Sequence, residues 1–221
     1  VTCHGANDGT VTITVDGGTP PYNYLGNPIP AGTTTIPALA PATYAGNVTD
    51  ANACAVAVSE VVTEPGVQTL TVSSTNATCN GATDGTANAV FANPTGSVTC
   101  KWSGGLTGSP LTNIGAGTYD VTATDGNNCT LTGTTTISEP LAAVMPVTAT
   151  DAACFGGNGS ATANPAGGTL PYSYTWSNGA GNLQTIAPPA GNYTVTATDA
   201  ASCNQTGSFT INQPAGMSVQ I

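Results

Sequence analysis

Basic residues are nearly missing from this sequence. Lys101 is its only lysine or arginine, against eleven carboxylates, and the formal net charge is −10 at pH 7. Binding to nucleic acid depends on clustered lysine and arginine side chains that neutralise phosphates and release counterions. The composition therefore excludes DNA, RNA and an anionic membrane surface as direct partners.

Histidine, charged residues in general and long apolar runs are also scarce. His4 is the only histidine, charged residues make up 5% of the chain, and no apolar run approaches the roughly 18 residues that cross a bilayer. Nucleophilic catalysis needs a base beside a serine, cysteine or threonine, and one imidazole in one part of the chain gives little scope for it. We expect no enzymatic activity, no cofactor, no metal site and no membrane insertion.

What the sequence does contain is a repeat of about 75 residues, marked by cysteine and proline. Two series of cysteines recur at this spacing, and each cysteine of the second series precedes a proline by eleven residues. The first series is Cys3, Cys79 and Cys154, the second is Cys54, Cys129 and Cys203, and the prolines are Pro65, Pro140 and Pro214. This periodicity predicts repeats at residues 1–65, 66–140 and 141–214, followed by a segment 215–221.

Apolar and polar residues alternate within each repeat, as they do in strands that bury one face. Val11, Ile13 and Val15 show this best, because threonines separate them. Short strands with frequent turn signals, and no helical pattern, are typical of antiparallel sandwiches. We predict an all-β fold of three tandem, small, Ig-like antiparallel β-sandwich modules with six or seven strands each. Tyr119 and Tyr193 follow Ala-Gly-x at a strand start, a position similar to a tyrosine corner.

The six repeated cysteines predict one disulfide inside each module. The absence of Cys-x-x-Cys and the single histidine argue against a metal site, so the expected pairs are Cys3–Cys54, Cys79–Cys129 and Cys154–Cys203. Each pair would close a loop of about 50 residues and stabilise the module by roughly 4 kcal/mol in the chain-entropy model. Disulfides in this number predict an oxidising compartment.

The seventh cysteine, Cys100, aligns with the strand tyrosines Tyr24 and Tyr174. The favoured interpretation is a small buried residue that replaces a tyrosine, because free cysteine packs well in cores. The alternative is a cross-link to another molecule.

The ends of the sequence are shifted by one strand relative to the repeat. A strand-like segment precedes the first cysteine of the second and third repeats, at 67–73 and 143–148, but not that of the first. The corresponding segment follows Pro214 and contains Met217, Val219 and Ile221. Either the 221 residues are a window from a longer array, which we favour, or this segment completes a sheet in another subunit by β-strand addition.

Carboxylates and aromatic residues recur where structural roles account for them. Asp50, Asp125 and Asp199 stand at a strand end, where turn capping is expected. Asp8 and Asp84 precede glycine near amide side chains, and we favour a turn role over a calcium site there. Trp102 and Trp176 could form a sugar-stacking surface with nearby tyrosines, but the alternation of Tyr172, Tyr174 and Trp176 places these three on one sheet face, which favours the core.

The assembled pattern resembles the SprB-type repeat of Bacteroidetes cell-surface proteins, which is named for a gliding-motility adhesin. That pattern runs Cys-x-Gly-x-x-x-Gly, Gly-Gly-x-x-Pro-Tyr-x-Tyr-x-Trp, Ala-Gly-x-Tyr-x-Val-x-x-x-Asp, Cys and a closing Glu-Pro. The third repeat matches it best, with Cys154, Gly168, Pro171, Tyr172, Tyr174, Trp176, Ala190, Gly191, Tyr193, Asp199, Cys203, Gln213 and Pro214. The second repeat departs from it, with Val98 and Cys100 where tyrosines are expected.

The resemblance spans nearly the whole chain and implies export to the cell surface, often by the type IX route, in long adhesins or filaments. It carries over no catalytic residues. We therefore expect a non-enzymatic, extracellular structural or adhesive protein of the cell surface, with head-to-tail neighbours of its own kind as partners. A surface polysaccharide stays open as a further partner. The residues proposed for contact with another molecule are Cys100, Met217, Val219 and Ile221. The alternative function is a carbohydrate-binding module array of a secreted protein.

Overall fold

The computed structural model describes residues 1–24, 27–29 and 32–220, so Ile221 lies outside the described residues. Across these residues the regular structure consists of eighteen β-strands and one short 3₁₀ turn at Ser103–Gly105. The strand pairings that the structure records are all antiparallel. The all-β prediction is confirmed. No helix long and apolar enough to cross a membrane occurs among the described residues.

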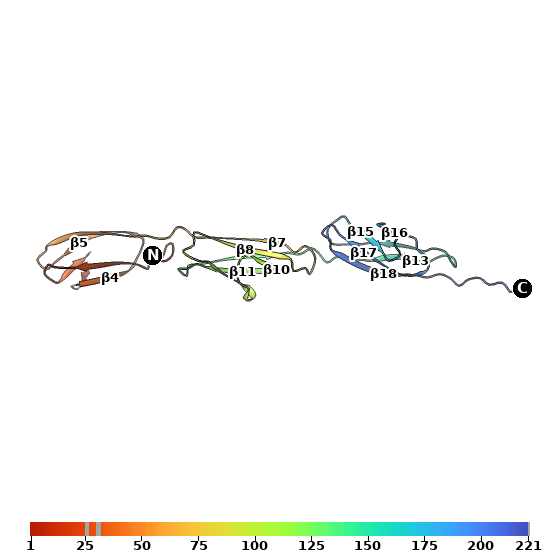
Figure 1. Cartoon of the computed structure of the whole chain (residues 1–221), viewed down its shortest axis with the longest axis horizontal. Coiled ribbons are helices and arrows are strands. Elements are labelled where there is room, and N and C mark those ends of the chain that lie inside the picture. Colours follow the sequence, from red (N-terminus) through yellow and green to blue (C-terminus); the bar gives the residue numbers. More distant parts are fainter. Residues whose placement is uncertain (25–26, 30–31, 221) are drawn as a thin grey trace. The chain divides into compact units, whose positions relative to one another are not determined.

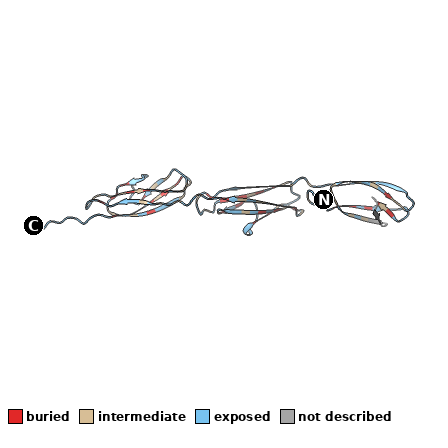
Figure 2. Cartoon of the chain, turned by 180° about the vertical axis from the view of Figure 1, so that it is seen from behind, coloured by how far each residue is buried: buried red, intermediate tan, exposed pale blue. Residues whose placement is uncertain are grey.

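The first repeat forms two sheets from six strands. One sheet pairs β1 (Gly9–Val15) with β4 (Gly32–Leu39). The other has the order β3 (Asn27–Ile29), β2 (Tyr22–Tyr24), β5 (Ala42–Thr49) and β6 (Ala55–Val62). Buried and exposed residues alternate along most of β1, and Figure 2 colours the chain by burial.

The two sheets of the first repeat enclose one apolar cluster. Val11 and Ile13 on β1 pack with Tyr22 and Tyr24 on β2 and with Val48 on β5. Because the period-2 pattern places these side chains on one face of each strand, the two sheets can bury them against each other. The predicted alternation at Val11 and Ile13 is confirmed.

The second repeat also contains six strands in two sheets. One sheet has the order β10 (Leu111–Ile114), β8 (Gly85–Ala92) and β7 (Thr69–Thr75). The other has the order β12 (Thr130–Ile137), β11 (Gly117–Thr124) and β9 (Thr99–Trp102). A glycine in the last strand allows close approach of the first: a Cβ on Gly133 would lie 2.6 Å from Cγ2 of Val72.

The third repeat has the same arrangement. One sheet has the order β13 (Val147–Thr150), β14 (Ser160–Ala163) and β16 (Thr185–Ile186). The other has the order β15 (Ser173–Trp176), β17 (Gly191–Thr198) and β18 (Asn204–Ile211). β15, β17 and β18 lie side by side in Figure 1. Ala161 and Ala163 face Trp176 and Val195 across the core.

A tyrosine at the start of the longest hairpin makes the same hydrogen bond in every repeat. The hydroxyls of Tyr44, Tyr119 and Tyr193 each donate to the carbonyl oxygen four residues earlier, at 3.0 Å. The tyrosine-corner position expected for Tyr119 and Tyr193 is therefore confirmed, and Tyr44 shares it.

The chain divides into two compact units, and each unit combines segments that are far apart in the sequence. The first comprises Val1–Ser73, Asn88–Ser109 and Asp120–Thr134, and the second comprises Ser74–Ala87, Pro110–Tyr119 and Thr135–Ile221. The module boundaries at Pro65, Pro140 and Pro214 stay predictions.

Candidate functional site

The second cysteine of each repeat lies in a hairpin turn that an aspartate organises. Oδ1 of Asp125 accepts hydrogen bonds from the backbone N–H groups of Asn127 and Cys129, both at 2.9 Å, and Oδ2 accepts one from Thr95. Asp50 and Asp199 make the equivalent bonds in the other two repeats. The turn-capping role expected of these aspartates is confirmed.

These hydrogen bonds change the acidity of the three carboxyl groups. The N–H of Thr95, followed by those of Cys129 and Asn127, lowers the pKa of Asp125 below its ordinary value. The N–H of Cys54 lowers the pKa of Asp50 most, and that of Thr169 has the same effect on Asp199. The carboxylates therefore remain charged acceptors and hold the hairpin turns.

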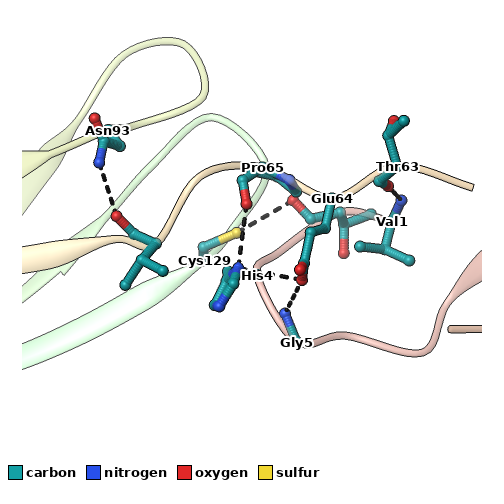
Figure 3. A network of polar contacts seen from close by, with 10 residues as sticks. Val1, His4, Gly5, Thr63, Glu64, Pro65, Asn93 and Cys129 are labelled. Atoms are coloured by element: carbon teal, nitrogen blue, oxygen red, sulfur yellow. Dashed lines mark hydrogen bonds and ion pairs between the residues drawn. The ribbon is translucent and has the colours of Figure 1, made fainter. Parts of the chain in front are cut away.

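The first cysteine of each repeat lies in a loop that the end of the same repeat holds. Oε2 of Glu64 accepts a hydrogen bond from the N–H of Gly5 at 2.8 Å and lies 3.1 Å from Nδ1 of His4, as Figure 3 shows. Glu139 and Gln213 accept the equivalent N–H bonds from Gly81 and Gly156. The Glu-Pro or Gln-Pro segment that closes a repeat therefore holds the loop that contains the first cysteine of the same repeat.

The two cysteines of one repeat consequently lie at opposite ends of its last strand. Cys54 immediately precedes β6, whereas the loop of Cys3 is bonded to Glu64, two residues after β6 ends. An eight-residue strand is about 26 Å long. A disulfide requires Cα atoms less than about 7 Å apart, so Cys3 and Cys54 cannot be joined.

The disulfides instead connect different repeats, and the expected pairing inside each module is wrong. Cys3 is bonded to Cys129 and Cys79 to Cys203, each with a Cα–Cα distance of 5.7 Å. Each bond joins the first cysteine of one repeat to the second cysteine of the next. Each bond also lies within one of the two compact units. The spacing of the cysteines could not distinguish pairing between neighbouring repeats from pairing within one repeat, because both patterns recur about every 75 residues.

Polar contacts accompany both disulfides. Thr2 O accepts a hydrogen bond from Nδ2 of Asn127 at 3.0 Å and lies 3.5 Å from Sγ of Cys129. Thr78 O lies at the same distance from Sγ of Cys203. Nearby, the backbone nitrogen of Val1 donates to Thr63 O at 2.7 Å (Figure 3). The residue before each bonded first cysteine thus contacts the hairpin of the next repeat.

Three cysteines are free, and they differ in exposure. Cys54 and Cys154, which the sequence places in disulfides, have exposed unpaired thiols. Cys100 on β9 is buried, opposite Ala123 on β11, as expected for a small core residue that replaces a tyrosine. Burial raises the pKa of the Cys100 thiol, which keeps it protonated and unreactive.

The other residues singled out in the sequence have structural neighbours. Trp102 and Trp176 are buried, and each indole N–H donates to a backbone carbonyl, of Gly108 and Leu183 respectively. Asp8 accepts the N–H and hydroxyl of Thr2, and Asp84 accepts those of Thr78. No group of three or more possible metal ligands occurs in the described part of the chain. Met217 and Val219 are exposed.

Comparison with known proteins gives one family and several structures. The family model for the SprB repeat matches residues 1–28 and 147–181, which together are less than half of the chain. A search of the curated proteins finds no match.

Among solved structures, the eight N-terminal Ig domains of DSCAM are 14% identical, with a TM-score of 0.40 over 95% of this chain and 35% of that chain. A C-terminal intimin fragment in complex with the intimin-binding domain of its receptor is 12% identical, with a TM-score of 0.38 over 65% of this chain and 63% of that chain. Drosophila OTK extracellular domains 3–5 are 10% identical, with a TM-score of 0.35 over 95% of this chain and 93% of that chain. The chain spans less than two thirds of the DSCAM and intimin structures.

Proposed function

Because the chain carries SprB-type repeat sequence, we propose that it is a non-enzymatic extracellular protein, a structural or adhesive part of a bacterial surface adhesin or fibre. Its disulfides support a location in an oxidising compartment, because such bonds form and persist outside the reducing cytosol. Its role is to span distance and to bear load.

The observation that carries this proposal is the overlap of the two disulfide loops. The loop closed by Cys3–Cys129 contains Cys79, and the loop closed by Cys79–Cys203 contains Cys129. The segment between Cys79 and Cys129 therefore belongs to both loops. A pulling force applied to the two ends passes from Cys3 through the first bond, along this segment, and through the second bond to Cys203.

This covalent path limits how far the protein stretches when it unfolds. The shared segment has about 50 residues, and at roughly 3.5 Å per residue it extends to at most about 180 Å. Without the disulfides, the roughly 200 residues from Cys3 to Cys203 extend to about 700 Å. A protein that keeps its length under load is suited to a surface spacer, and an enzyme would have no need of it.

Single-molecule force extension of the 221-residue chain, held at its two ends, tests the proposal. We expect the unfolded length between Cys3 and Cys203 to stay below about 180 Å without reductant and to reach about 700 Å with reductant. Equal lengths under both conditions would remove the mechanical role. Antibody labelling of intact cells, before and after permeabilisation, tests the surface location separately.

A further inference from the structure

An apolar groove opens on the second repeat, beside the edge strand β9. Its volume is about 610 Å³, and its lining includes Ala89, Phe91, Val98, Cys100, Gly108 and Ser109. We call it the β9 groove. All of its lining residues lie within 88–109, and therefore within the first compact unit. The volume falls in the range of about 300–1,000 Å³ that is usual for small-molecule pockets.

One wall of the β9 groove corresponds to a bulkier segment in the third repeat. Trp102 donates its indole N–H to Gly108 O at 2.8 Å, and Trp176 donates the equivalent bond to Leu183 O at 2.7 Å. Glycine therefore stands in the groove wall where the third repeat has leucine. A Cβ built on Gly108 would meet no atom within 4 Å, so this wall borders open space.

The next residue of this wall is also smaller than its counterpart. Ser109 Oγ accepts the N–H of Ala89 at 2.7 Å and lies 3.0 Å from Ala89 O. In the third repeat, the longer side chain of Gln184 donates to Ala163 O at 3.1 Å. Serine thus attaches the wall to β8 with fewer side-chain atoms than glutamine does. Because these bonds fix the wall, the groove is formed before any ligand binds.

The floor of the β9 groove lacks an aromatic ring that the other repeats have. Cys100 lies opposite Ala123 on β11, just as Tyr174 lies opposite Ala197 on β17. The Tyr174 side chain packs against the core of the third repeat, and Tyr24, at the same position of the first repeat, is 2% exposed. A thiol is much smaller than a phenol ring. The second repeat therefore leaves open a space that tyrosine fills elsewhere.

A second tyrosine is replaced two residues earlier. Val98 stands where the first and third repeats have Tyr22 and Tyr172. The hydroxyls of those tyrosines donate to the carbonyl oxygens of Gly17 and Gly167, and valine can neither make that bond nor fill the space of the ring. The residues that are smaller than their counterparts in the third repeat therefore line one groove: Val98, Cys100, Gly108 and Ser109.

The single lysine of the protein also lines the β9 groove. Lys101 is exposed on β9, opposite Thr122, and the third repeat has Thr175 at this position, opposite Thr196. The chain has eleven carboxylates, yet no carboxylate oxygen of the described residues lies within 4.0 Å of the Lys101 ammonium group. An ammonium group without a partner beside an apolar groove favours a ligand that joins a negative charge to an apolar body.

We propose that the β9 groove binds a small aromatic carboxylic acid. The ring of the ligand occupies the space that tyrosine fills in the other repeats, and its carboxylate pairs with Lys101 at the edge of the groove. Because the net charge of −10 repels anions from the rest of the surface, this lysine decides where an acidic ligand binds. The site is a binding activity beyond the proposed spacer function and does not depend on it.

Titration of the ¹⁵N-labelled 221-residue chain with 4-hydroxyphenylacetate, followed by NMR, tests the proposal. This acid has the phenol ring of a tyrosine side chain and a carboxylate. We expect a saturable shift of the Trp102 indole N–H signal, because this group is bonded to the groove wall, with a dissociation constant on the order of 1 mM for so small a ligand. The Trp176 indole N–H is the internal control and should not shift, because Tyr174 fills the corresponding space.

A neutral analogue tests the role of Lys101. We expect 4-hydroxyphenylacetamide to bind about fivefold more weakly than the acid, which is the upper range for one solvent-exposed ion pair. In Lys101→Thr, which introduces the residue of the third repeat, the acid and the amide should bind equally. Equal affinities of the acid and the amide for the wild-type chain would overturn the proposal, because Lys101 would then take no part in binding.

Filling the groove from the chain itself tests the place of the ring. Cys100→Tyr supplies the missing phenol ring and should abolish the Trp102 shift. Cys100→Ser is the matched control, because it leaves the space open and should bind the acid as the wild-type chain does. Circular dichroism shows whether each variant keeps its sheets. Val98→Tyr is the second filling variant, and it should also abolish binding if Cys100→Tyr does not fold.

Three further results would contradict the proposed site. The first is the absence of a saturable Trp102 shift up to about 20 mM acid, well above the expected dissociation constant. The second is an equal shift of the Trp102 and Trp176 signals. The third is a folded Cys100→Tyr variant that binds the acid as the wild-type chain does. None of them affects the proposed spacer function, because the force measurement depends on the two disulfides and is made without the acid.

Discussion

Cys3 is bonded to Cys129, 126 positions further along the sequence, and not to Cys54 in its own repeat. Two sets of hydrogen bonds account for this, since Glu64 holds the loop of Cys3 at one end of β6 while Asp50 holds Cys54 at the other. A disulfide placed in this way adds no cross-link inside a sandwich. It fixes one repeat to the next.

Removal of this bond tests its contribution to stability. In the double variant Cys3→Ser/Cys129→Ser, we expect the free energy of unfolding to fall by about 3–5 kcal/mol, because a loop of this length restricts the unfolded chain strongly. Urea unfolding followed by circular dichroism measures the change. Cys54→Ser is the matched control, because Cys54 has the same hairpin position but no disulfide, and its effect should stay below about 1 kcal/mol. Equal losses in both variants would contradict the assignment of the disulfide.

The sequence predicted the sheet architecture well, because strand alternation and turn chemistry depend on neighbouring residues. The buried alternation of Val11 and Ile13 and the capping by Asp50 are examples. Disulfide pairing could not be derived in the same way, since a period of about 75 residues brings Cys3 and Cys79 each into register with two second cysteines. The deciding contact is the hydrogen bond from Gly5 to Glu64, residues 59 positions apart.

One spacing in the sequence agrees with the observed pairing but does not select it. Each second cysteine precedes the closing proline by eleven residues, enough for a full strand between that cysteine and the end of the repeat.

The three free cysteines should differ in reactivity. In the native chain under non-reducing conditions at pH 8, iodoacetamide should modify Cys54 and Cys154 within minutes, because both thiols are exposed. Cys100 should react only after denaturation, because burial shields it and raises its pKa. Mass spectrometry of chymotryptic peptides measures this order. Early modification of Cys100, or modification of Cys3 or Cys79 in the native chain, would contradict the structure.

Stability should decrease in acid through the hairpin aspartates. Because backbone N–H bonds lower the pKa of Asp50, Asp125 and Asp199 in the folded chain, these groups bind protons more weakly folded than unfolded. Their contribution is complete above the unfolded pKa of about 3.9 and is lost as the pH falls through the folded values. The urea midpoint should therefore be lower at pH 3 than at pH 7.

Asp125→Asn should weaken this acid dependence and lower the midpoint at pH 7. The two carboxylate oxygens of Asp125 accept hydrogen bonds from the N–H groups of Thr95 and Cys129. An asparagine has one oxygen and one NH₂ group, so its NH₂ group would face one of these two N–H donors and could not accept from it. Asp120→Asn is the control, since an asparagine oxygen can still accept the hydroxyl of Thr134 that Asp120 accepts at 2.6 Å. A variant with the wild-type acid dependence would show that Asp125 does not contribute to it.

Trp176 distinguishes a core role from a sugar-binding role. Its side chain is 3% exposed, its N–H donates to Leu183 O at 2.7 Å, and its ring meets that of Phe209 edge to face at 5.7 Å. Trp176→Ala should therefore reduce the free energy of unfolding by about 3–5 kcal/mol in urea titrations, because it leaves a cavity and an unpaired carbonyl. Phe155→Ala removes an aromatic ring that is 64% exposed and should cost less than about 1 kcal/mol. If Trp176→Ala instead left stability unchanged and abolished saturable binding to a glycan, the residue would be part of a binding surface and the carbohydrate-binding alternative would replace the structural one.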